Sequence, residues 1–221
     1  MRSPSVPGDL DRVERVWSRA AALAVATAMV GDGDRFKWAD GALHCENAGG
    51  AYWWRLQMFD GGRAVLCGQD SDASHTHLVE PPVDLLAGGP DWLPWEGLRH
   101  EAKDRVLGYV YWWEDGSWGR APYPQDVEDD GLEASVPWAG IGEEARRELV
   151  ASMVAVTEPD CDPAEAVARF LTGVQARAVD EAAIAALVEE LCRPRDRERA
   201  DMAAALTLAA ELGVSSGQDV G

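Results

Sequence analysis

Positive charge is what this sequence lacks most. It contains 20 basic residues against 39 acidic ones, and its formal net charge at pH 7 is −19. A chain with this charge repels the phosphates of nucleic acids and the anionic surface of membranes, so both are disfavoured as partners. A basic protein partner is favoured, because opposite fields steer association. The simpler interpretation is that the charge only keeps the protein in solution.

Long apolar runs and paired cysteines are also missing. No stretch reaches the ~18 apolar residues of a membrane span. The apolar run 20–30 follows a leader of mixed charge, which is not typical of a secretory signal. The four cysteines, Cys45, Cys67, Cys161 and Cys192, form no C-x-x-C pair and match no zinc module. We therefore expect reduced, mostly buried thiols and a cytoplasmic location.

Catalytic and cofactor motifs are absent as well. The glycines at 31 and 33 lack the strand and the Lys-Ser/Thr pair of a phosphate-binding loop. Neither a G-x-S-x-G nor an H-E-x-x-H pattern occurs. These absences favour a protein without enzymatic activity, and we expect no bound cofactor.

What the sequence does contain is a repeated hairpin signal. Three times a run of aromatic and β-branched residues meets an Asp-Gly turn and then resumes, at 40–41, 60–62 and 115–116. Asp-Gly between such runs predicts a hairpin, because a type I′ turn needs positive φ at both central residues. Three hairpins predict an antiparallel sheet of about six strands.

Helices are predicted before and after this region of the sequence. Asp9 and the apolar spacing that follows it predict an N-terminal helix to about residue 30. Amphipathic spacing and helix-stop signals predict C-terminal helices over 143–157, 164–173, 180–191 and 195–212.

The expected fold is therefore α+β, with the N-terminal helix and the C-terminal helical group packed on the antiparallel sheet. We expect residues 1–142 to form the N-terminal helix and the sheet, and residues 143–213 to form a helical region. Residues 214–221 are expected to be a disordered tail.

Tryptophan is the second prominent feature. Trp53-Trp54 and Trp112-Trp113 fall in predicted strands, where adjacent residues point to opposite faces of a sheet. One face can pack on helices, and the insertion 70–104, rich in Pro and Gly, either covers the other face or leaves it exposed. A covered face would form a second small core, and an exposed one would bind a partner. The residues predicted to bind a partner come from the third hairpin, from the insertion and from the acidic run after the hairpin: Trp92, Trp95, Trp112, Trp113, Trp118, Asp126, Asp129 and Asp130.

A second candidate site follows the second hairpin. Asp70, Asp72, His75 and His77 place four potential metal ligands within eight residues. In an extended segment the two histidines share a face, so both can reach one ion. The alternative function is therefore a metal-dependent hydrolase. The competing interpretation is a polar strand end whose Asp and Ser side chains cap turns.

Three stretches, GRAVLCGQDSDASHTH, PVDLLAGGPDWLPW and YVYWWEDGSWGRAPYP, resemble uncharacterised actinobacterial proteins and the acidic α+β immunity proteins that accompany secreted toxins. The resemblance covers residues 35–140. It rests on the general character of these stretches and not on a diagnostic motif, so no functional residue is carried over from it. It implies a protein that binds and blocks another protein. We therefore predict a cytoplasmic, non-catalytic protein that binds a basic partner through an acidic, tryptophan-rich surface.

Overall fold

The structure is a computed structural model that describes residues 1–47, 49–104, 107–157, 159–160 and 162–216. The chain divides into two compact units. Residues 1–13 and 40–141 form one unit, called here the sheet unit, and residues 14–39 and 142–221 form the other, the helical unit. The second boundary falls next to the predicted start of the helical region. The N-terminal helix belongs to the helical unit, whereas the sequence grouped it with the sheet.

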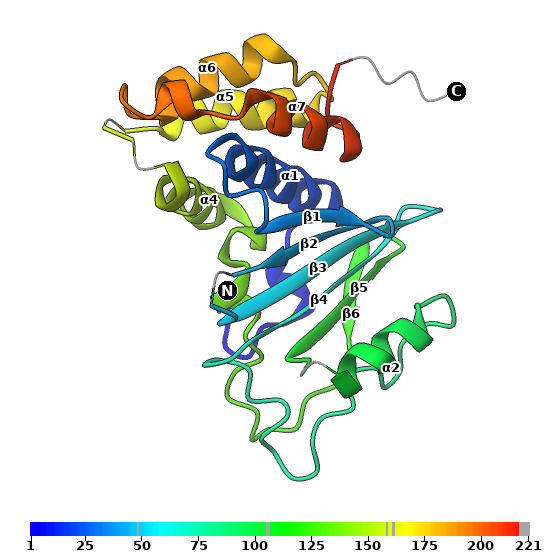
Figure 1. Ribbon diagram of the computed structural model, residues 1–221. Helices are drawn as coiled ribbons and strands as arrows, with labels where there is room; N and C mark the ends of the chain where they lie inside the picture. The colour runs from blue at the N-terminus through cyan, green and yellow to red at the C-terminus, as the bar shows by residue number, and fades with distance from the viewer. Residues whose placement is uncertain (48, 105–106, 158, 161, 217–221) are drawn as a thin grey trace. The chain divides into compact units, whose positions relative to one another are not determined.

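The described residues form an antiparallel sheet of six strands, which confirms the predicted α+β fold. The strands follow one another across the sheet in chain order, as Figure 1 shows. They are β1 (Phe36–Ala39), β2 (Ala42–Glu46), β3 (Tyr52–Phe59), β4 (Arg63–Asp70), β5 (Tyr109–Glu114) and β6 (Ser117–Arg120).

All three predicted Asp-Gly hairpins are present. Asp40 and Asp115 have positive φ angles of 54° and 50°, and φ is also positive at the glycine that follows each of them, as a type I′ turn requires. The strand order places these two turns and the turn at 60–62 at the same end of the sheet. The long connection 71–108 leaves β4 at the opposite end.

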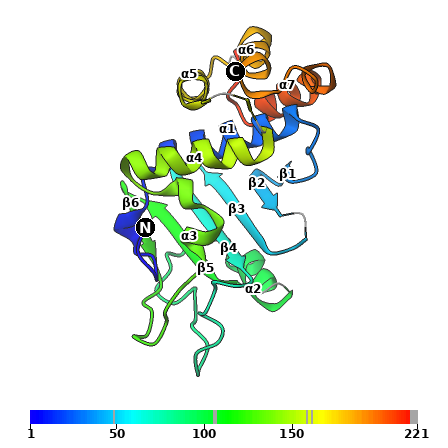
Figure 2. The same cartoon turned by 90° about the vertical axis from the view of Figure 1, so that its left-hand side faces the viewer.

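One face of the sheet packs on segments from both ends of the sheet unit. Trp54, Tyr111 and Trp113 point to this face, because side chains alternate along each strand. The short helix α3 (Leu132–Ser135) lies against β3 and β4, and the 3₁₀ turn η1 (Pro7–Asp9) lies against β6 (Figure 2).

The opposite face is covered by the connection 71–108 and its helix α2 (Trp95–Asp104). Leucines of this connection pack on Trp53, Cys67 and Val110 of the sheet in one apolar cluster. The connection also contains a hydrogen-bonded turn, in which the N–H of Ala87 donates to the Asp84 carbonyl over 3.1 Å. The insertion therefore builds the second small core that was one of the two sequence interpretations.

The helical unit contains the N-terminal helix and the C-terminal helices. Their bounds are α1 (Val13–Met29), α4 (Gly142–Thr157), α5 (Ala164–Gln175), α6 (Glu181–Leu191) and α7 (Met202–Glu211). The single helix predicted over 195–212 is wrong. The chain forms a 3₁₀ turn, η3 (Arg197–Arg199), and α7 starts afresh where Asp201 caps it by accepting the Ala204 N–H over 2.9 Å.

Two further boundaries differ from the predicted ones. The N-terminal helix begins at Val13, because the Asp9 carboxylate instead accepts the Val6 N–H (3.1 Å) and closes η1. At the other end, Val214 is buried and Val179 donates its N–H to the Val214 carbonyl over 3.0 Å. Residues 214–216 therefore belong to the fold, and the rest of the predicted tail lies outside the described residues.

Candidate functional site

Two of the tryptophans predicted to bind a partner are buried in the core of the sheet unit. The Trp113 and Trp118 rings stack edge to face with centroids 5.4 Å apart. Trp118 also donates its indole N–H to the Asp11 carbonyl over 2.7 Å. These two rings are inaccessible to a partner, so their assignment to a binding surface is wrong. Pairing Trp118 with Trp113 across the hairpin turns both rings toward the same, covered face.

The other three predicted tryptophans lie on the opposite face and are half-buried under the insertion. Trp92 and Trp95 come from the insertion itself, and Trp112 comes from β5. The Trp112 ring lies directly on Gly119 of β6, where an added Cβ would come within 2.4 Å of the indole nitrogen. All three pack against the second core, so most of their area stabilises the insertion.

Asp130 is the third predicted residue that the structure removes from the surface. Its side chain is fully buried and accepts the backbone N–H groups of Ser5 and Leu132, each over 3.3 Å. Its Oδ2 lies 2.8 Å from the Tyr111 hydroxyl and 3.3 Å from the Tyr123 hydroxyl. These hydrogen bonds join the N-terminal segment to the sheet, because Asp130 bridges Ser5 and Tyr111, which are distant in sequence.

The hydrogen-bond geometry around Tyr111 favours a protonated Asp130. The Tyr111 hydroxyl lies 2.8 Å from the Asp130 carboxyl group and 2.8 Å from the Ser5 carbonyl, and it has a single proton to donate. Both contacts are satisfied when Asp130 donates to Tyr111 and Tyr111 donates to Ser5. Burial, which disfavours the charged carboxylate, raises the pKa of Asp130 above its usual 3.8. Burial likewise raises the pKa of Tyr111 well above 10.

An acidic surface nevertheless lies next to this buried network. The N–H of His75 donates to the Asp129 carbonyl over 3.0 Å, which joins the start of the insertion to the acidic run. Asp129 is half-buried and Asp126 is exposed. We define the acidic surface as the four exposed carboxylates of these two joined segments together with the exposed Leu78: Asp72, Leu78, Glu80, Asp126 and Glu128.

Leu78 gives the acidic surface an apolar anchor that the sequence analysis missed. It is 68% exposed and sits in the turn in which its N–H donates to the His75 carbonyl over 2.9 Å. The signal in the sequence that could have predicted this exposed residue was a leucine placed between two histidines and two prolines. Exposed leucines are common singly, but this one lies two residues before Glu80, in a segment that the His75–Asp129 hydrogen bond joins to the acidic run.

The four predicted metal ligands do not form a metal site. Asp70 is buried, and its Oδ1 accepts the N–H groups of Asp72 and Ala73, each over 3.0 Å. Within the part of the chain that the structure describes, no three His, Cys, Asp or Glu side chains are grouped to hold one ion. Asp70 therefore caps a turn, as the competing interpretation stated, and the alternative of a metal-dependent hydrolase has no site among Asp70, Asp72, His75 and His77.

An ion pair under α2 was not predicted from the sequence. The Arg55 guanidinium of β3 lies 2.7 Å from Glu101 of α2, and both side chains are mostly buried. The Cys67 thiol is 3.8 Å from the same carboxylate, and burial raises the pKa of Cys67 to about 12. The thiol is therefore protonated and not a nucleophile, and the cluster anchors α2 to the sheet. Cys45 and Cys192 are also buried free thiols, while Cys161 lies outside the described residues.

The described residues contain no helix that is both long and apolar enough to span a membrane.

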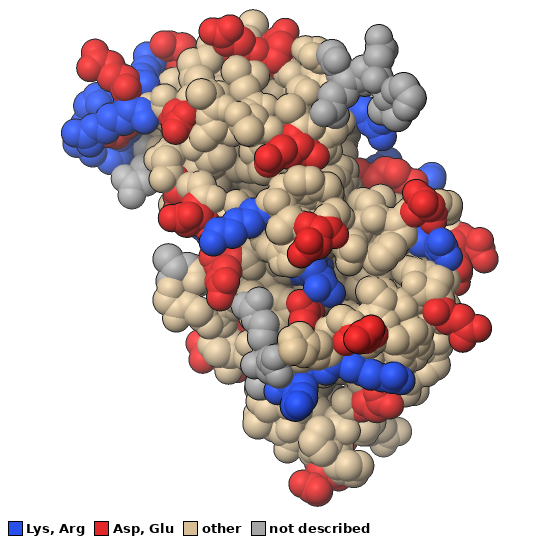
Figure 3. All heavy atoms as spheres, turned by 45° about the vertical axis from the view of Figure 1, so that its right-hand side comes forward, with Lys and Arg blue, Asp and Glu red and all other residues tan. Residues whose placement is uncertain are grey.

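On the face drawn in Figure 3, acidic side chains lie singly or in small groups among uncharged residues, with basic groups between them. Charge by itself therefore does not mark a site on that face.

Comparison with models of protein families, with curated proteins and with solved structures finds no match to this chain.

Proposed function

We propose that this chain is a non-catalytic, cytoplasmic binding protein of the toxin-immunity type, which recognises a basic protein partner through the acidic surface. The observation that carries the proposal is that the four carboxylates of this surface are exposed and form no ion pair with any described residue. Carboxylates that are not neutralised within the molecule attract an oppositely charged partner over a distance and favour the correct approach.

The composition of the sheet unit supports this proposal. It contains 20 acidic and 8 basic residues, a net charge of −12, whereas the helical unit contains 19 and 12, a net charge of −7. Several of the few cations of the sheet unit are already used within the fold. Arg55 pairs with Glu101, and Arg120 donates to the Ser5 carbonyl over 3.1 Å while it stacks on Tyr123.

Leu78 supplies the remaining component of a protein interface. Interfaces derive most of their affinity from a few anchor residues that become buried on binding, and the charged groups around them contribute mainly to rate and specificity. In the proposed complex, Leu78 is the anchor and the carboxylates of the acidic surface contact lysines or arginines of the partner.

The proposal is tested by two triple variants that remove the same number of charges from the two ends of the sheet. Asp72→Asn/Asp126→Asn/Glu128→Gln neutralises the acidic surface. Asp40→Asn/Asp60→Asn/Asp115→Asn neutralises the three hairpin turns, where asparagine accepts the same backbone conformation. Each protein is used to capture partners from a lysate of the source cells, and captured proteins are identified by mass spectrometry.

We expect one basic protein to be captured by the wild type and by the hairpin-turn variant and to be lost from the acidic-surface variant. Co-expression with the wild type should then relieve any toxicity of that protein. Equal capture by all three proteins, or equal loss from both variants, would contradict recognition through the acidic surface.

A further inference from the structure

A pocket of about 370 Å³ lies within the insertion, between its segment 77–86 and its helix α2. Its floor is apolar and consists of the buried side chains Leu85, Leu86 and Leu107. The half-buried ring of Trp95 forms one wall. A volume of this size lies in the range of small-molecule sites, which are mostly apolar with a few polar groups that orient the ligand.

Two nitrogen-bearing side chains stand at the mouth of this pocket. Arg99 and His77 both line it and are both exposed. The Arg99 guanidinium lies over the Trp95 ring at 5.3 Å from the ring centroid. Among the described residues, no carboxylate pairs with Arg99. A guanidinium that is held on an aromatic ring and lacks an anionic partner is well suited to bind a carboxylate.

We propose that this pocket binds a small amphipathic acid, with an apolar or aromatic body and a single carboxylate. The body fills the space over Leu85, Leu86 and Leu107 and contacts the Trp95 ring. The carboxylate accepts hydrogen bonds from Arg99, and the His77 imidazole is the second donor within reach of the mouth. This inference does not depend on the proposed binding of a basic protein.

The position of Asp84 explains why the ligand has one carboxylate and not two. Asp84 lines the same pocket and its Oδ1 accepts the Leu86 N–H over 3.1 Å. A second negative charge on the ligand would lie in the same small space as this carboxylate and be repelled by it. A cationic ligand is disfavoured in turn, because Arg99 stands at the entrance.

The groove between α4 and α5 in the helical unit is a second candidate for binding a carboxylate, and it is less suitable than the pocket of the insertion. That groove, of about 260 Å³, also has an apolar floor and two arginines. There, however, Arg146 already forms an ion pair with Glu143 at 3.4 Å. Its cations are thus partly neutralised within the protein, whereas Arg99 is not.

The test is calorimetric titration of the full chain with 4-phenylbutyrate and with 4-phenylbutan-1-ol, which has the same body without the charge. We expect the acid to bind the wild type and the alcohol to bind about tenfold more weakly, because a hydrogen bond to a charged group is lost. Arg99→Gln should weaken binding of the acid about tenfold and leave binding of the alcohol unchanged. Lys103→Gln is the matched control: it removes the same charge from an exposed position of α2 outside the pocket and should change the affinity by less than about twofold.

A second variant tests the location of the bound body. Ala102 is an exposed residue of α2 that lines the pocket, so Ala102→Trp fills the space without disturbing the core. We expect it to abolish binding of both compounds. The proposal is overturned if the acid does not bind the wild type, if Arg99→Gln binds it as tightly as the wild type does, or if Ala102→Trp leaves binding intact.

Discussion

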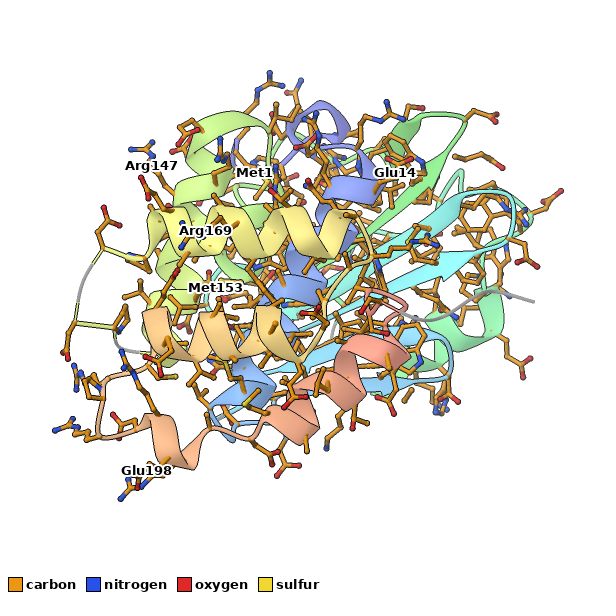
Figure 4. All side chains as sticks on the ribbon, turned by 90° about the horizontal axis from the view of Figure 1, so that it is seen from above. Met1, Glu14, Arg147, Met153, Arg169 and Glu198 are labelled. Atoms are coloured by element: carbon orange, nitrogen blue, oxygen red, sulfur yellow. The ribbon has the colours of Figure 1, made fainter. Side chains whose placement is uncertain are left out.

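In the helical unit several surface arginines form ion pairs with carboxylates, whereas the carboxylates of the acidic surface form no ion pair with any described residue. Arg193 lies 3.3 Å from Asp160, and Arg169 of α5 contacts Glu190 of α6 and lies 3.9 Å from Glu165. Figure 4 shows Arg169 on α5, on the side that faces α6. A surface whose charges are paired internally offers little to a charged partner. The difference supports the proposal that recognition of a partner lies in the sheet unit.

The interiors of the two units differ as well. Eight of the ten tryptophans belong to the sheet unit, and its core includes the buried Asp130 network with tyrosine hydroxyls. The core of the helical unit is built largely from alanines and aliphatic side chains. A few large rings and polar groups thus hold the sheet unit together, whereas many small contacts hold the helical unit. Single substitutions should consequently have larger effects in the sheet unit.

The largest effect is expected from the buried tryptophan pair of the sheet unit. Trp54 and Trp138 are each about 1% exposed, and their ring centroids are 5.4 Å apart. Trp54→Ala should lower the free energy of unfolding by about 3–5 kcal/mol, because it leaves a cavity in a close-packed core. The measurement is urea denaturation followed by circular dichroism.

The matched control is the tryptophan pair of the helical unit. Trp17 and Trp38 also stack edge to face, at 5.8 Å, but both are half-buried. Trp17→Ala should therefore cost about half as much or less, in proportion to the smaller apolar area that it removes from contact. A loss at Trp17 as large as the loss at Trp54 would contradict the distinction between the two cores.

An intermediate effect is expected at Asp130, and it depends on pH. The pKa of Asp130 in the folded protein is raised above 3.8, so between 3.8 and the raised value the folded state holds a proton that the unfolded state has lost. Stability contributed by this group is therefore present at low pH and falls as the pH rises through that window. Asp130→Asn, which stays neutral, should lack this slope.

The measurement is the difference in unfolding free energy between the wild type and Asp130→Asn at several pH values, starting below 3.8, the lower end of this window, and going upward. We expect the difference to shift in favour of the variant as the pH rises, by about 1.4 kcal/mol for each unit by which the pKa is raised. Parallel pH profiles of the two proteins would show that Asp130 is ionised in the folded state, contrary to the geometry around Tyr111.

The smallest effect is expected at the paired surface charges of the helical unit. Arg169 is 60% exposed, so its ion pairs are screened by solvent and Arg169→Gln should cost only a few tenths of a kcal/mol, within the range of about 0–1 typical of exposed pairs. Asp126→Asn in the sheet unit should be neutral or slightly stabilising, because this carboxylate has no cation to lose. Denaturation at low and high salt separates the two, and a clear loss of stability in Asp126→Asn would show that its charge is paired after all.

Much of the sheet could be predicted from the sequence because its signals are local. Asp-Gly turns identify the hairpins, and the alternation of strand residues places Trp53 and Trp54 on opposite faces. The coverage of each face was left open, because it depends on where the insertion packs. The burial of Asp130 was not predictable, since Asp130 lies in a run of acids and its partners Ser5 and Tyr111 are distant in sequence. The pocket was missed for the same reason, because His77 and Arg99, which are far apart in sequence, line one pocket only in the folded chain.

The central claim is that the acidic surface of the sheet unit recognises a basic protein. The most direct test is the association rate constant of the captured partner, measured by stopped-flow fluorescence at low ionic strength for the wild type and both triple variants. We predict that Asp72→Asn/Asp126→Asn/Glu128→Gln slows association about tenfold or more, and that Asp40→Asn/Asp60→Asn/Asp115→Asn, with the same change in net charge, slows it less than about threefold. Equal slowing by both variants would show that only the net charge matters, and it would contradict recognition through this surface.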